Sequence, residues 1–102
     1  MQFLIDKGFK YDVIGDIEEE NEPSLVFALL CNKDNVGKII EYFRSIGIEK
    51  IEELLINKIE IFLVDYDNLL MSFDNYDIPT LVQLINEDIN MINIVKIKSP
   101  IE

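Results

Sequence analysis

The sequence contains no histidine and no tryptophan, and its only cysteine is Cys31. Without histidine the chain lacks the commonest general base and metal ligand, and neither a Ser-His nor a Cys-His nucleophile can form. A single cysteine supplies neither a zinc site of His and Cys ligands nor an intramolecular disulfide. We therefore expect a protein of a reducing compartment that is not an enzyme and needs no cofactor.

Glycine is scarce, and long apolar runs are absent. The four glycines are scattered, so no phosphate-binding loop is present. Asp65, Asp67 and Asp74 offer the oxygen ligands that Mg²⁺ or Ca²⁺ prefers, but no motif arranges them and we expect no metal. No apolar run approaches the roughly 18 residues of a membrane span. The first residues, "MQFLIDKGFK", lack the basic start and long apolar stretch of a signal peptide, so we expect none. These features predict a cytoplasmic protein without a membrane partner.

Basic residues are few and unevenly placed. The chain has 20 acidic residues against 9 basic ones, a net charge of -11. Residues 11–32 and 59–95 contain acids but no base, whereas residues 33–58 hold five of each sign. A field of this sign repels nucleic acid and attracts basic proteins. We expect a cationic protein partner and no nucleic acid, with solubility alone as the other interpretation.

Acidic and tyrosine side chains alternate in one part of residues 59–95. Tyrosine rings offer rigid contact area and can accept a cation, and carboxylates bind arginine through two hydrogen bonds. The other interpretation is that these acids are solvated and that Phe73 and one tyrosine belong to the core. A second set follows in the run "DIEEENEP". The predicted partner-binding residues are Asp65, Tyr66, Asp67, Asp74, Tyr76 and Asp77, with Asp16, Glu18, Glu19, Glu20 and Glu22.

The length of 102 residues and an apolar fraction of 49% predict one globular domain, residues 1–102, with one core. Cys31 follows the apolar run 25–30, which predicts a small core residue. Apolar residues recur at helical spacing in residues 34–47, 49–58 and 78–88. Asp34 and Asp77 are the expected N-caps, Gly47 the expected stop, and Pro79 falls in a first turn.

The last two of these helices match at a period of 30 residues. A fainter copy lies upstream in "KGFKYDVIGDI". Self-similarity of this length is typical of stacked helical hairpins, and three would fill the chain. The apolar pairs are Ile48/Ile78, Ile51/Leu81, Leu54/Leu84, Leu55/Ile85, Ile59/Ile89, Ile61/Met91 and Val64/Ile94.

The segments "YFRSIGIEKIEELL" and "FLIDKGFKYDVIGDIEEENEPSLVF" resemble the repeat of the mitochondrial transcription termination factor family. The resemblance implies an all-α fold of about three stacked helical hairpins in a short right-handed arch. Members of that family bind nucleic acid on basic concave surfaces, and the acid-only segments depart from this. We therefore carry over the fold and not the activity.

Short apolar runs leave a second fold open. Residues 25–30, 59–65 and 92–98 are rich in Ile, Val, Leu and Phe, and each has the length of a buried strand. The alternative is therefore an α+β domain with strands there.

A small acidic domain without a catalytic set is similar to bacterial immunity proteins. That resemblance implies an acidic binding protein that neutralises a basic partner, foremost the active or nucleic-acid-binding cleft of a toxin nuclease domain. A phage-type inhibitor that mimics nucleic acid is one alternative, because carboxylates can stand in for phosphates. A helical-repeat adaptor that binds independently of salt is another. The oligomeric state stays open.

Overall fold

Every regular element in residues 1–97, the part of the chain that the computed structural model describes, is helical. The predicted all-α fold is confirmed. In chain order the elements are α1 (Gln2–Asp6), α2 (Tyr11–Glu20), α3 (Pro23–Cys31), α4 (Lys33–Ile46), α5 (Ile51–Asn57), the 3₁₀ helix η1 (Ile59–Phe62), α6 (Tyr66–Phe73), α7 (Ile78–Glu87) and the 3₁₀ helix η2 (Ile89–Ile94).

The alternative with three strands is wrong for the described residues. Residues 25–30 lie within α3, and residues 59–65 begin with η1. Residues 92–94 are the second half of η2 and 95–97 follow it, while residue 98 of the third expected strand lies outside the described part. In η1 the backbone bonds locally, from Ile61 N–H to the Lys58 carbonyl at 3.1 Å and from Leu63 N–H to the Glu60 carbonyl at 3.0 Å. Such bonds to the third residue back replace those of a sheet.

Three of the four predicted helix signals are confirmed. Gly47 ends α4 with a positive φ of 96°, Asp77 accepts a hydrogen bond from the Thr80 N–H at 3.3 Å, and Pro79 lies in the first turn of α7. The prediction that Asp34 caps α4 is wrong, because α4 already begins at Lys33. Only Asn32 separates α3 from α4, so Asp34 falls within the first turn.

The period of 30 residues corresponds to a repeated local structure. Helix α5 runs directly into η1, and α7 runs into η2 in the same way. The entry to α5 is also repeated upstream. Gly8 and Gly47 share a φ of 96°. The next N–H then bonds back to a carbonyl five residues earlier, Phe9 to Leu4 and Ile48 to Phe43, each at 3.0 Å. The junctions α1–α2 and α4–α5 therefore use one turn geometry.

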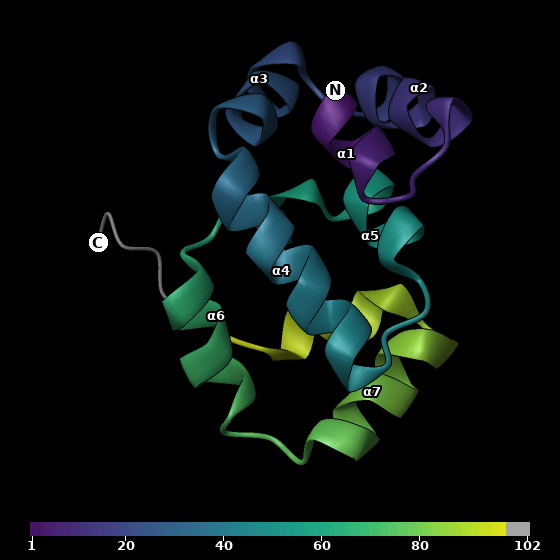
Figure 1. The fold of residues 1–102 in the computed structure, drawn as a ribbon. Helices are drawn as coiled ribbons and strands as arrows, with labels where there is room; N and C mark the ends of the chain where they lie inside the picture. The colour runs from purple at the N-terminus through teal and green to yellow at the C-terminus, as the bar shows by residue number, and fades with distance from the viewer. Residues whose placement is uncertain (98–102) are drawn as a thin grey trace.

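Helix α4 lies at the centre of the molecule. In Figure 1 it runs between α3 above, α6 on the left, α5 on the right and α7 below, and it contacts all four of them and η1. Its Phe43 is fully buried. The Phe43 ring lies 5.6 Å from that of Phe62 and 5.8 Å from that of Phe73, measured between centroids, so the core joins α4, η1 and α6. Phe73 is thus a core residue.

Candidate functional site

The two predicted acidic sets lie at different ends of the molecule. The α2 acidic edge consists of Asp16, Glu18, Glu19, Glu20 and Glu22, which are all exposed. The α6 surface consists of Asp65, Tyr66, Asp67, Asp74, Tyr76 and Asp77. Figure 1 shows α2 at the upper right and α6 at the lower left, with the centre of the molecule between them. The structure therefore keeps the two sets apart.

Neither set forms an ion pair with the basic residues of the described part of the chain. Within residues 1–97, both ion pairs involve Glu41, which lies 3.4 Å from Lys7 Nζ and 3.4 Å from Arg44 Nη1. Glu41 belongs to the charge-balanced middle of the sequence. No acid of residues 11–32 or 59–95 forms an ion pair with the described basic residues. The negative potential of these carboxylates therefore acts on the surrounding solvent and on any molecule that approaches the protein.

Three residues of the α6 surface have structural roles. Asp65 accepts a hydrogen bond from the Asn68 N–H at 3.2 Å and caps α6, as Asp77 caps α7. The Tyr76 hydroxyl donates to the Ile94 carbonyl at 2.9 Å. The two caps stabilise the first turns of α6 and α7, and the Tyr76 bond holds the α6–α7 connection to the end of η2, so these contacts account for Asp65, Tyr76 and Asp77 without any partner protein.

Tyr66 also contacts the chain itself. Its side chain is half-buried, and Lys38 Nζ lies 5.9 Å from the centre of its ring. The Tyr66 N–H bonds to Asn35 Oδ1 at 3.0 Å, and Asn35 Nδ2 donates to the Val64 carbonyl at 2.7 Å. Tyr66 therefore already has an intramolecular cation over its ring.

Asp67, Met71 and Asp74 form the outward stripe of α6. Their spacing of four and three residues places them on one helix face, and all three are exposed. The thioether of Met71 is flexible and adapts to irregular apolar surfaces. The fold does not explain this stripe, in which Asp67 and Asp74 of the α6 surface lie on either side of the exposed Met71.

Helix α3 carries an apolar face that sequence reasoning missed. It buries only Leu29 fully, while Phe27 is 67% exposed, Leu30 is 41% exposed and Cys31 is exposed. The prediction that Cys31 is a core residue is wrong. A helix turns by about 100° per residue, so Cys31 lies about 200° round from Leu29. The available signal was the absence of any charged residue in Pro23–Cys31, which left no polar outer face.

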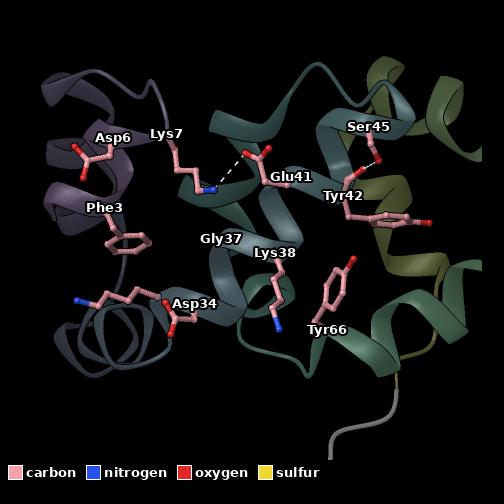
Figure 2. Close-up of a pocket in the computed structure, with 11 residues that line it drawn as sticks. Phe3, Asp6, Lys7, Asp34, Gly37, Lys38, Glu41, Tyr42, Ser45 and Tyr66 are labelled. Atoms are coloured by element: carbon pink, nitrogen blue, oxygen red, sulfur yellow. Dashed lines mark hydrogen bonds and ion pairs between the residues drawn. The ribbon is translucent and has the colours of Figure 1, made fainter.

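An open groove separates α1 from α4 and α6 (Figure 2). Its volume is about 870 Å³, and its lining includes Phe3, Lys7, Lys38, Glu41, Tyr42 and Tyr66. Figure 2 shows Lys7 reaching across to Glu41, and a Cβ atom at Gly37 would lie 3.3 Å from Lys7 Cε. The lining contains three lysines and three acids, so the groove is charge-balanced, and it shares only Tyr66 with the α6 surface.

Residues 1–97 contain neither a cluster of metal ligands nor a membrane-spanning helix. In residues 1–97 no three acidic or cysteine side chains gather in a way that could hold a metal ion, and Asp65, Asp67 and Asp74 form no such group. None of the helices in that part of the chain has the length and apolar character needed to cross a membrane.

No family model matches the chain, and neither a curated protein nor a solved structure matches it.

Proposed function

We propose that this chain is an acidic binding protein that captures a basic protein in the cytoplasm. The foremost candidate partner is a toxin nuclease domain, whose active or nucleic-acid-binding cleft the chain would cover as an immunity protein. One observation carries the proposal: the acids of residues 11–32 and 59–95 form no ion pair with the described bases, although nine bases are available in the sequence.

The mechanism begins with electrostatic steering. A net charge of -11 accelerates the approach of a basic surface, most strongly at low ionic strength. On contact, carboxylates such as Asp67 and Asp74 pair with arginine or lysine, and Met71 between them covers apolar surface. The buried aromatic residues around Phe43 hold these helices in place, so little order has to be gained on binding.

The test is capture of a basic partner from source lysate, followed by kinetics with the purified partner. We expect the association rate constant to fall at least tenfold between about 50 mM and 500 mM salt, because salt screens the attraction. Near-equal rate constants would contradict the proposal. If the partner is a nuclease, its activity should be inhibited at equal molar amounts.

A matched pair of variants tests whether the affinity for the partner depends on where the negative charges lie. Asp67→Asn with Asp74→Asn removes two charges from the outward stripe of α6, and Glu52→Gln with Glu53→Gln removes two exposed charges from α5. Equal loss of affinity in both variants would indicate a general field effect without a defined contact.

The alternative functions give different outcomes. A nucleic-acid mimic would bind the phosphate-binding surface of a defence or DNA-processing protein, and DNA would compete with it. A helical-repeat adaptor would bind with an affinity independent of salt. Under every one of these proposals the chain itself produces no gel shift with RNA or DNA at low salt.

A further inference from the structure

Helix α3 presents an apolar face that residues 1–97 leave uncovered. Phe27 and Leu30 are three residues apart and therefore adjacent on the helix surface, and Cys31 extends the face at its C-terminal end. The face spans residues 27–31 of this nine-residue helix, a rise of about 6 Å along the helix axis. It matches about one turn of a second helix.

The chain that leads into this helix carries only acids. Glu18, Glu19 and Glu20 form the last turn of α2, Glu22 immediately precedes α3, and all four are exposed. Helices α2 and α3 contact each other and only two residues separate them, so these carboxylates lie near the N-terminal end of α3, and Phe27 follows about one turn into that helix. The last turn of α2 contains no base. Because the C-terminal end of a helix is itself partly negative, three acids there destabilise α2 and favour a cation nearby.

Charge determines which kind of occupant fits. A second copy of the chain on α3 would bring together two molecules that each carry a net charge of -11, and their mutual repulsion opposes this association. An apolar face with an acidic border instead complements a helix that is apolar on one side and basic beside it.

We propose that α3 and the α2 acidic edge together form the docking surface for a cationic amphipathic helix of the partner protein. The apolar side of that helix covers Phe27 and Leu30, and its lysines or arginines meet Glu18, Glu19 and Glu22. This inference rests on the proposed capture of a basic protein, and it adds a contact at α3 that is separate from the carboxylates of α6.

The size of the effect follows from the exposure of Phe27. A phenylalanine of which 67% is exposed offers on the order of 100 Å² for burial. Loss of that area from the interface weakens binding by about tenfold to a hundredfold.

The probe for the test is a synthetic helix of about 15 residues composed only of leucine and lysine, with the leucines on one face. A peptide with glutamate in place of every lysine is its control. Calorimetry gives the dissociation constant, and the reaction of Cys31 with a chromogenic disulfide reports occupancy, because Cys31 lies four residues from Phe27 on α3. We expect the lysine peptide to bind and to slow the Cys31 reaction, and the glutamate peptide to do neither.

Two variants with similar exposure locate the contact. Phe27→Ser should weaken binding of the lysine peptide by the factor above, whereas Met71→Ser, which alters a 66% exposed residue of α6, should leave it within twofold. Because neither side chain is buried, we expect both variants to fold. Far-UV circular dichroism and thermal unfolding check this. Neutralisation of Glu18, Glu19 and Glu22 to glutamine should weaken binding and reduce its salt dependence.

Four results would overturn the inference. If Met71→Ser weakens binding and Phe27→Ser does not, the peptide docks on α6, and capture of a basic partner still stands. If the triple glutamine variant binds unchanged, the acids play no part in docking. If the wild type sediments as a dimer that Phe27→Ser dissociates, a second copy covers α3. If the lysine peptide does not bind at all, α3 is no docking surface for a cationic helix, and the salt dependence measured with a captured partner decides the proposed function separately.

Discussion

The turn geometry at the end of α4 can be tested by one methyl group. Gly47 has a φ of 96°, in the left-handed region that residues with a Cβ atom rarely adopt. In Gly47→Ala the added Cβ lies 3.8 Å from Val82 Cγ1, which is an ordinary contact, so the cost comes from the backbone alone. That cost is about 1–2 kcal/mol for a residue other than glycine.

Gly15 provides a control with the same chemical change. It lies within α2, and nothing is within 4 Å of the position where its Cβ would be. Alanine favours a helix interior by about 0.5–1 kcal/mol relative to glycine. Gly15→Ala should therefore stabilise the protein while Gly47→Ala destabilises it, with a difference of about 1.5–3 kcal/mol between the two variants.

The assay is unfolding by urea and by heat, followed by circular dichroism at 222 nm. In a domain of this size 1 kcal/mol shifts the midpoint temperature by about 4–8 °C. The melting temperature of Gly47→Ala should fall by at least that amount, and that of Gly15→Ala should rise by several degrees. A Gly47→Ala variant as stable as the wild type would refute the left-handed end of α4, and with it the shared geometry of the α1–α2 and α4–α5 junctions.

Two further predictions concern the acids and tyrosines around α6 and α7. Asp77→Ala removes the side-chain cap of α7 and should lower the free energy of unfolding by about 1 kcal/mol in urea titrations, whereas Asp77→Asn, which keeps an acceptor oxygen, should lower it less. Burial, with the nearby Asp74 and Tyr66, raises the pKa of the Tyr42 phenol above its ordinary 10.0. The folded protein then holds this proton more tightly than the unfolded chain does. The stability that follows from this difference is complete below pH 10 and is lost as the pH rises through the pKa of Tyr42 in the folded protein. Tyr42→Phe should therefore lose less stability than the wild type above about pH 10, and an equal loss in both would contradict the assignment.

The helices that sequence reasoning located are those with one apolar and one polar face. In α4, Val36, Ile39, Ile40 and Phe43 recur at helical spacing with charged residues between them, and all four are buried. The predicted bounds for this helix, for α5 and for α7 differ from the observed ones by at most two residues at either end. Such a pattern reveals both the helix and the side that it buries.

Helix α3 could not be located in this way, because it is apolar on every side. Spacing then indicates neither whether the segment is a strand or a helix nor which residues are buried. The packing of α3 against α2 and α4 decides that Leu29 is buried and that Cys31 is not. For the same reason spacing did not show that the two acidic sets lie far apart, since their separation depends on how the intervening helices pack.

Position along each helix distinguishes the acids that serve the fold from those that do not. Asp65, Asp77 and Asp88 precede α6, α7 and η2, and each accepts a backbone hydrogen bond at the helix start, where negative charge is favourable. Glu18, Glu19 and Glu20 occupy the opposite position, the end of α2, where their charge opposes the helix dipole. Folding alone would therefore favour neutral or basic residues there. Because these three acids weaken the helix that carries them, a bound cation would relieve repulsion that the free protein has to tolerate, and this supports the proposed docking of a basic partner beside α3.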